Sequence, residues 1–361
     1  MTAIPVRAVL LGCGMVAEEY ATTLASAPGI EVVACADLDS ERAAAFAARH
    51  HLTVLPAAQL LDPALTDLAV ILTPPHTHAT VVSDAIAARI PAIWCEKPLA
   101  LDPADADRVV REAATAGSLL AVAPDTVLGP ALQTAAHALA AGIVGSPLSA
   151  TATLLSTGPE RWHPAPEPFY AHGAGPLGDM GPYYLAALDL LFGRLRVHSA
   201  IARTRPVRTI RSGPATGKHF TAQASTHLVA LLEAETSGIP ITLTASFDAA
   251  ATRAPHIEIQ GTAGTLLLPD PNFHEGDVQF TPYGERAWRT LPPAAADTPP
   301  SRGAGVINLA HALRSAKPPQ CPADRAVRTA HLAHAILEAA TPRTLPRQPQ
   351  QHLPQAQEPS R

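Results

Sequence analysis

The chain is long enough for two domains and carries only a mild charge. It has 361 residues and a formal net charge of −5 at pH 7, without a block of like charges. Domains of about 100 to 200 residues are usual, so two domains and a small-molecule ligand between them are expected. The charge pattern argues against nucleic acid and against a polybasic membrane anchor as partners. Because neither a signal-peptide pattern nor an apolar run of about 18 residues occurs, we expect a soluble, cytoplasmic protein.

The first third of the chain alternates short apolar strands with alanine-rich helical stretches. The expected strands are residues 6–11, 30–36, 68–73, 91–95 and 119–123. Strict alternation of strand and helix predicts parallel strands whose helical crossovers cover both faces of the sheet. We therefore expect an α/β protein that begins with a Rossmann-type, doubly wound domain over residues 1–123.

A glycine-rich turn, "GCGMVA", follows the first strand. Glycines at such a turn let backbone N–H groups approach a pyrophosphate, which then rests on the positive end of the following helix. The alternative is a tight turn from strand to helix that binds no ligand. The cofactor contacts predicted here are Gly12, Gly14, Met15 and Val16.

An acidic residue ends the second strand. Asp37 follows the glycine turn at about the ~20-residue spacing at which a carboxylate bonds the ribose hydroxyls of a dinucleotide. Since a carboxylate repels a 2′-phosphate, Asp37 favours NAD as the cofactor. Arg42 lies a few residues further on and is suited to pairing with a 2′-phosphate, so NADP is the alternative.

Two later segments lie where a parallel sheet collects its ligands, at the carboxyl ends of its strands. They are "TPPHTHA", which follows the third clear strand, and "EKPLAL", which follows the fourth. Only three lysines occur in the chain, and a lysine can give up its proton whereas arginine does not, so Lys97 is a candidate for chemistry. The alternative for this triplet is a solvated loop. The predicted cofactor contacts are Thr73, Pro74, Pro75, His78, Glu96 and Lys97.

The pattern changes after a hinge near residues 124–130. A stretch such as "IPITLTASF" alternates apolar residues with threonine and serine, as an antiparallel strand with one polar face does. We expect an α+β domain with an open, mainly antiparallel sheet over residues 124–340. The segment 341–361 is rich in proline and glutamine and is expected to be disordered.

A proline-rich loop over residues 156–176 precedes a helical run in the second domain. Polar and aromatic side chains on a long loop suit the hydroxyls and faces of a sugar, although a plain surface connection is an equal alternative. The candidate substrate contacts on this loop are Arg161, Trp162, His163 and His172.

The helical run opens with "LGDMGPYYL", residues 177–185. Asp179 and Tyr183 are four residues apart and therefore share one face of a helix. Tyr184 is expected to pack within the second domain, as an aromatic residue on an amphipathic helix usually does.

These motifs together resemble the glucose–fructose oxidoreductase/inositol dehydrogenase family, Gfo/Idh/MocA. The resemblance rests on the GCG turn, Asp37, "TPPHTHA", "EKPLAL" and "GAGPLGDMGPYY". It implies hydride transfer between NAD(P) and a hydroxyl or carbonyl of a sugar, cyclitol or related compound. It also implies that Lys97 contacts the nicotinamide ribose and the substrate, and that Glu96 helps to hold the cofactor.

The resemblance includes one departure. The family writes Asp-x-Gly-x-His where this chain has Asp179 and then Tyr183, so the usual proton-carrying histidine is replaced by tyrosine. We expect Lys97, Asp179 and Tyr183 to be the catalytic residues, with Asp179 and Tyr183 also in the substrate site. A nearby ammonium from Lys97 is expected to lower the pKa of the Tyr183 phenol.

Two other functions fit the same sequence. The first alternative is an enzyme that cycles NAD internally to drive elimination or epimerisation, and the second is a non-enzymatic NAD-binding regulatory or scaffold protein.

No cysteine or histidine spacing typical of a metal site occurs, so no metal is expected. The open sheet predicts a homodimer or homotetramer, because helices of its own domain can cover only one face.

Overall fold

A parallel sheet forms the first domain of the computed structural model, which describes residues 4–295, 299–315 and 317–344. The elements of this domain are β1 (Val6–Leu11), α1 (Met15–Ala25), β2 (Ile30–Ala36), α2 (Ser40–His50), β3 (Thr53–Val54), α3 (Ala57–Leu60), β4 (Leu68–Ile71), α4 (His78–Ala87), β5 (Ala92–Cys95), α5 (Pro103–Ala116) and β6 (Leu119–Val122). Within the described ranges the strands form one six-stranded sheet in the order β3-β2-β1-β4-β5-β6.

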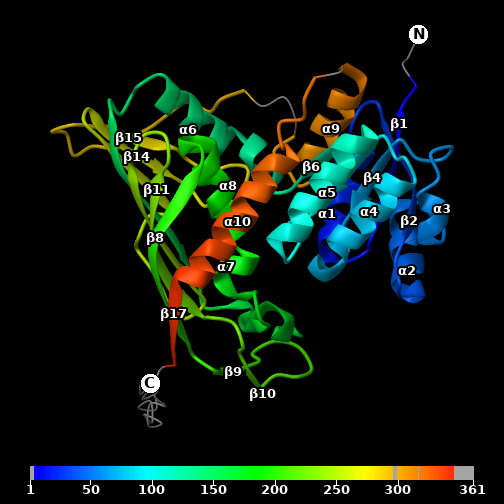
Figure 1. The fold of residues 1–361 in the computed structure, drawn as a ribbon, viewed down its shortest axis with the longest axis horizontal. Helices are drawn as coiled ribbons and strands as arrows, with labels where there is room; N and C mark the ends of the chain where they lie inside the picture. Colours follow the sequence, from blue (N-terminus) through cyan, green and yellow to red (C-terminus); the bar gives the residue numbers. More distant parts are fainter. Residues whose placement is uncertain (1–3, 296–298, 316, 345–361) are drawn as a thin grey trace, which may run out of the picture.

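Helices bury both faces of this sheet, which explains the near-continuous apolar strands. β1, β4 and β5 expose almost no side chain, as central strands of a parallel sheet do. α1 and α2 pack on one face, and α4 and α5 pack on the other (Figure 1). The predicted doubly wound fold and its five strands are confirmed, and the short strand β3 is an addition.

The second domain is built on a larger mixed sheet. As far as β16, the elements of this domain are α6 (Pro130–Ala140), β7 (Pro147–Leu155), α7 (Gly175–Asp179), α8 (Gly181–Phe192), β8 (Leu195–Thr204), β9 (Val207–Thr209), β10 (His219–Thr221), β11 (His227–Ala234), β12 (Pro240–Ser246), β13 (Ile257–Gly261), β14 (Gly264–Leu268), β15 (Gln279–Pro282) and β16 (Arg289–Thr290). Most neighbouring strands are antiparallel, and β7 pairs with β12 in parallel. The predicted α+β domain with an open sheet is therefore confirmed.

This sheet has one covered face and one open face. In β12, Ile241 and Leu243 are buried whereas Thr242 is exposed, which confirms the predicted alternation. Figure 1 shows α6, α7 and α8 between the sheet and the first domain. The opposite face presents exposed apolar side chains from two neighbouring strands, namely Ile201, Val229 and Leu231.

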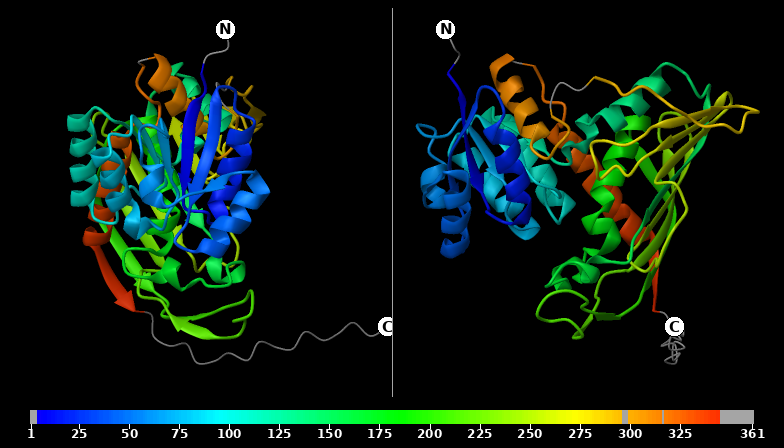
Figure 2. Two further views of the ribbon diagram at one scale, coloured as in Figure 1. Left: turned by 90° about the vertical axis from the view of Figure 1, so that its right-hand side faces the viewer. Right: turned by 180° about the vertical axis from the view of Figure 1, so that it is seen from behind.

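Two C-terminal helices return toward the first domain. α9 (Ala304–Ser315) packs against β5 and β6, and Gly305 lies so close to the Trp94 ring that a Cβ atom would be 2.0 Å from it. α10 (Ala323–Ala339) contacts α5 of the first domain and both α8 and β8 of the second (Figure 2). Asp189 on α8 accepts hydrogen bonds from Arg325 and Arg328 on α10, so a buried carboxylate ties these helices together.

The chain ends its described part as a strand, which corrects one expectation. Residues from 341 onward were expected to lack structure, but β17 (Ala340–Thr344) pairs in parallel with β8. Backbone hydrogen bonds to an edge strand need no apolar side-chain period, so composition does not reveal this strand. The rest of the predicted tail, 345–361, lies outside the described residues. No helix in the described ranges is long and apolar enough to cross a bilayer.

Candidate active site

The turn after β1 requires glycine and leaves a helix end accessible. Gly12 has φ of +101°, and a Cβ atom there would be 2.6 Å from the carbonyl oxygen of Leu72. Gly14 precedes α1 and has nothing within 4 Å of a Cβ position. Among the described residues no side chain caps the first turn of α1, and the Ala17 N–H bonds to the Gly14 carbonyl, so the N–H groups of Met15 and Val16 remain to bind an anion. Met15 is exposed and Val16 is half-buried at this helix end. The turn therefore fits the pyrophosphate of a dinucleotide.

Asp37 lies beside this turn and is already paired. Its carboxylate accepts a hydrogen bond from the Cys13 N–H at 2.8 Å and from the Arg42 guanidinium at 3.0 and 3.1 Å. Partial burial alone would raise the pKa of the Asp37 carboxyl, but the bonds from Arg42 and from two backbone N–H groups outweigh burial and lower that pKa. Asp37 is therefore ionised, and its charge is paired with that of Arg42.

His78 joins the two loops that follow β4 and β5. One ring nitrogen lies 2.7 Å from the carbonyl oxygen of Thr73, and the other lies 2.6 Å from that of Pro98. The side chain is 1% exposed. The loop with Pro74 and Pro75 is therefore held against the loop that carries Lys97, and His78 supports both from inside the protein.

Glu96 is held in a buried chain of hydrogen bonds. One carboxylate oxygen accepts from the Tyr20 hydroxyl at 2.7 Å, and the other accepts from the Lys97 N–H at 2.9 Å. The Tyr20 hydroxyl in turn accepts from the Trp94 indole at 3.0 Å. These bonds fix the backbone at the end of β5 and so fix the direction in which Lys97 leaves the sheet.

Lys97 reaches across to the second domain. Its ammonium donates to the backbone carbonyl of Asp179 at 2.6 Å and to the Asp179 carboxylate at 3.3 Å. Burial alone would lower the pKa of Lys97, but the neighbouring Tyr183, Asp179 and Glu96 outweigh burial and raise it. Lys97 is therefore a charged hydrogen-bond donor in the protein as it stands.

Tyr183 lies over the same ammonium. Its ring centroid is 4.9 Å from the Lys97 Nζ atom, and the side chain is 5% exposed. Burial raises the pKa of the Tyr183 phenol, and the opposing effect of Lys97 is smaller. The expected net lowering of this pKa is wrong, because the sequence does not reveal how deeply the ring is buried. Tyr184 packs within the second domain, where its hydroxyl lies 2.7 Å from His256 Nδ1.

A further cation at this ring has no counterpart in the sequence motifs. The Arg302 guanidinium carbon is also 4.9 Å from the Tyr183 ring centroid. Arg302 precedes α9, whose first N–H groups donate to the buried Asp125 carboxylate. Sequence reasoning missed Arg302 because only the return of α9 to the first domain brings residue 302 next to residue 183.

The proline-rich loop is held by buried hydrogen bonds of its own and lies apart from these contacts. Arg208 anchors it through Glu160 and Tyr170, all of which are buried. Trp162 is 56% exposed and stacks edge-on with His163. In the described part of the chain, no hydrogen bond or ion pair joins Lys97, Asp179 or Tyr183 to the candidate substrate contacts on this loop. Those candidates are Arg161, Trp162, His163 and His172.

A cavity of about 530 Å³ lies elsewhere, between α10, β8 and the end of α8. Its lining includes Asp189 and Arg328, which pair with each other, and none of the candidate catalytic residues. We do not assign chemistry to it, because its buried carboxylate is already bonded to two arginines.

Comparison with known proteins supports the fold and identifies the family. Residues 6–123 match a family model described as an oxidoreductase family with an NAD-binding Rossmann fold. Residues 132–267 match the model of the GFO/IDH/MocA C-terminal domain.

Similar proteins include curated dehydrogenases. The chain is 28% identical over 269 residues to D-apiose dehydrogenase of Paraburkholderia graminis, covering 73% of this chain and 67% of that protein. It is 28% identical over 270 residues to inositol 2-dehydrogenase 3 of Saccharopolyspora erythraea, covering 74% of each. Its fold is similar to that of KijD10, a 3-ketoreductase from Actinomadura kijaniata crystallised with NADP, with a TM-score of 0.75, 23% identity and coverage of 95% of this chain and 100% of that one.

The two glycines of the turn should respond differently to alanine. Gly12→Ala is expected to lower the free energy of unfolding by about 1 to 3 kcal/mol, because it forces a positive φ and a clash with Leu72. Gly14→Ala should change stability by less than about 0.5 kcal/mol, since its φ is −75° and its surroundings are open. Gly14→Ala should instead weaken dinucleotide binding, because the methyl group occupies the approach to the N–H groups of α1. Denaturant unfolding measures the stability of each variant, and a fluorescence titration with NADH measures its dinucleotide binding. Equal stability of the two variants would contradict the different roles given to Gly12 and Gly14.

Proposed function

Because the chain belongs to the Gfo/Idh/MocA family of NAD-binding oxidoreductases, we propose that it moves a hydride between nicotinamide and a secondary hydroxyl or carbonyl of a sugar, cyclitol or related polyhydroxy compound. The observation that carries the proposal is the meeting of Lys97, Asp179 and Tyr183 at the carboxyl end of β5, on the edge of the sheet where the glycine turn lies. The names of the relatives, D-apiose dehydrogenase and inositol 2-dehydrogenase, support this substrate class.

The first domain would hold the cofactor. The N–H groups at Gly14, Met15 and Val16 would bind the pyrophosphate, and Asp37 with Arg42 would meet the adenosine ribose. The loop of Thr73, Pro74 and Pro75, supported by His78, would lie along the cofactor, and Glu96 would fix the backbone beneath it. When bound, the nicotinamide accepts or gives the hydride.

Lys97, Asp179 and Tyr183 would transfer the proton and orient the substrate. In reduction, the charged Lys97 polarises the carbonyl oxygen and Tyr183 gives its phenol proton to that oxygen. In oxidation the same proton returns from the substrate hydroxyl to Tyr183. Asp179 orients the substrate hydroxyl and balances the charge of Lys97. The raised pKa values of Lys97 and Tyr183 leave both groups protonated, which suits the reducing direction.

The proline-rich loop would complete the substrate site. Its exposed and half-buried polar and aromatic side chains suit a ring with several hydroxyl groups. It also leads directly into α7, which carries Asp179. The residues proposed for substrate binding here are Arg161, Trp162, His163 and His172.

A substrate panel tests the proposed reaction. The purified protein is mixed with NAD⁺ and sugars, cyclitols and sugar acids, or with NADH and the matching ketones, and nicotinamide absorbance is followed. A change in absorbance with one compound supports the proposal. Conversion of substrate without net change in absorbance would instead support internal hydride cycling, and cofactor binding without any conversion would support a regulatory or scaffold role.

Substitutions at the tyrosines should separate chemistry from packing. Tyr183→Phe is expected to lower kcat by up to ~10² to 10⁴, the usual contribution of a positioned acid–base group. Lys97→Met should lower it further, because it removes the charge nearest to both Tyr183 and Asp179. Tyr184→Phe is the matched control, since it loses only the contact with His256 and should keep kcat. A wild-type kcat in Tyr183→Phe would show that its hydroxyl has no part in the reaction, and all three variants should still bind NADH.

The pairing of Asp37 with Arg42 makes cofactor preference testable. The wild-type protein should bind NADH more tightly than NADPH, because the Asp37 carboxylate faces the ribose. Arg42→Ala should weaken NADPH binding by on the order of tenfold more than NADH binding, because the carboxylate then loses its neutralising partner. Arg49→Ala, which removes an exposed ion pair on the same helix, is the control. Tighter binding of NADPH than NADH by Arg42→Ala would overturn this account.

We also infer a cytoplasmic homodimer or homotetramer. The four cysteines are buried and none forms a disulfide in the described ranges, which suits a reducing compartment. The open face of the large sheet exposes Ile201, Val229 and Leu231 in adjacent strands, which suits contact with a second copy. Light scattering should show an oligomer, and Val229→Lys should dissociate it; a monomeric wild-type protein would contradict the inference.

A further inference from the structure

Two cations share one buried aromatic ring. The Nζ atom of Lys97 and the guanidinium carbon of Arg302 each lie 4.9 Å from the ring centroid of Tyr183. The two cations therefore lie within about 10 Å of each other and repel, so the arrangement needs compensation from negative groups or from the ring itself. The side chain of Arg302 is 15% exposed, and water screens little of this repulsion.

Asn272 holds the Arg302 guanidinium, and among the described residues no carboxylate forms a hydrogen bond with it. Its guanidinium donates to the side-chain oxygen of Asn272 at 2.8 Å and to the Asn272 carbonyl at 3.3 Å. The nearest carboxylates are those of Glu19 at 3.9 Å and Asp125 at 4.0 Å, both beyond hydrogen-bonding distance. Among the described residues, the buried Nη1 atom of Arg302 has no hydrogen-bond acceptor. Arg302 therefore presents positive charge to Tyr183 and is held rigidly while it does so.

We propose that Arg302 is a positioning residue that fixes the Tyr183 phenol beside Lys97 and favours its ionised form. The inference rests on the proposed function, in which the phenol gives a proton to the carbonyl oxygen during reduction and takes one from the hydroxyl during oxidation. Oxidation needs the phenolate as acceptor, so a second cation at the ring helps most in that direction.

The charges that face Tyr183 come from four elements. The loop after β5 supplies Lys97 and Glu96, α7 supplies Asp179, and the segment before α9 supplies Arg302, with Asp125 behind it. The pKa of the phenol is raised by burial, and Glu96 and Asp179 raise it further, while Lys97 and Arg302 lower it. Removing Arg302 leaves burial less opposed, so the phenol should ionise at higher pH.

A fluorinated tyrosine at position 183 measures this directly. Its phenol ionises at lower pH than that of tyrosine, and its fluorine NMR signal follows the ionisation without substrate or cofactor. Arg302→Met should raise the titration midpoint by about one unit or more, the effect expected of one opposite charge at this distance. Arg302→Lys keeps the charge, so its titration midpoint should stay close to that of the parent protein. Equal midpoints in the parent protein and in Arg302→Met would overturn the proposal.

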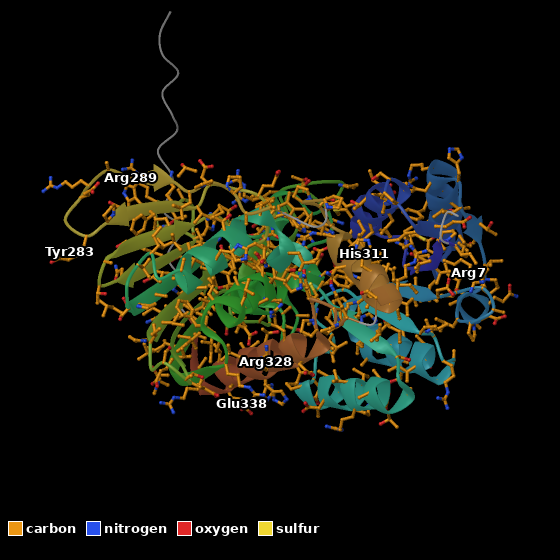
Figure 3. All side chains as sticks on the ribbon, turned by 90° about the horizontal axis from the view of Figure 1, so that it is seen from above. Arg7, Tyr283, Arg289, His311, Arg328 and Glu338 are labelled. Carbon is orange, nitrogen blue, oxygen red and sulfur yellow. The ribbon has the colours of Figure 1, made fainter. Side chains whose placement is uncertain are left out.

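Two further variants guard against a structural explanation. Arg289→Met removes an arginine at the far end of the second domain and should leave the midpoint unchanged (Figure 3). Asn272→Ala keeps Arg302 and its bond to the backbone carbonyl at position 272 but removes the shorter bond to the side-chain oxygen. It should give a smaller upward shift, so it replaces Arg302→Met if that variant does not fold. An unchanged midpoint in Asn272→Ala would then overturn the proposal.

Kinetics separates this inference from the proposed function. With an active substrate, Arg302→Met should move the pH profile of oxidation upward while leaving NADH affinity unchanged. If the substrate panel fails but the NMR midpoint moves, the role of Arg302 stands and the proposed reaction falls. If the panel succeeds and the midpoint does not move, the reaction stands and this inference falls.

Discussion

The contact between the Lys97 ammonium and Asp179 joins the end of a parallel strand in the first domain to a short helix in the second. The placement of the other groups follows from it. Glu96 and Tyr20 hold the backbone from which Lys97 extends. Asp179 and Tyr183 do not share one helix as expected, because α7 ends at Asp179 and α8 begins at Gly181, yet the ring of Tyr183 still meets the ammonium. The half-buried amine and carboxylate each cost free energy to desolvate, and their mutual contact offsets part of that cost.

The sequence predicted those parts of the fold and site that depend on local pattern. Apolar runs with helical crossovers predicted the parallel sheet, and the glycine turn predicted the accessible end of α1. The family resemblance, and not local pattern, placed Lys97 and Asp179 in one site although they lie more than eighty residues apart. The missing parts depend on distance through space. Arg302 reaches Tyr183 because α9 folds back, β17 depends on a free edge of β8, and the direction of the Tyr183 pKa shift depends on burial.

Asp37 and Arg42 illustrate how one ion pair can serve two opposite requirements. The carboxylate is needed to accept hydrogen bonds from a ribose, yet each of its oxygens already accepts a bond from Arg42. A bound dinucleotide must therefore share this carboxylate with the guanidinium or displace it. The Arg42 side chain is 50% exposed, and an exposed ion pair costs little free energy to rearrange, so selectivity between cofactors depends on Arg42 and not only on the acidic residue.

The position of α9 has a consequence for how the molecule is divided. The helix comes from the far end of the chain, yet it covers β5 and β6, and Gly305 packs directly on Trp94. Thr23 on α1 also hydrogen-bonds to Ser301, immediately before this helix. The first domain is thus discontinuous in sequence: a fragment cut after residue 123 would leave an apolar face of its sheet open to water. Circular permutation or domain exchange within this architecture must carry residues 301–315 along with the N-terminal segment.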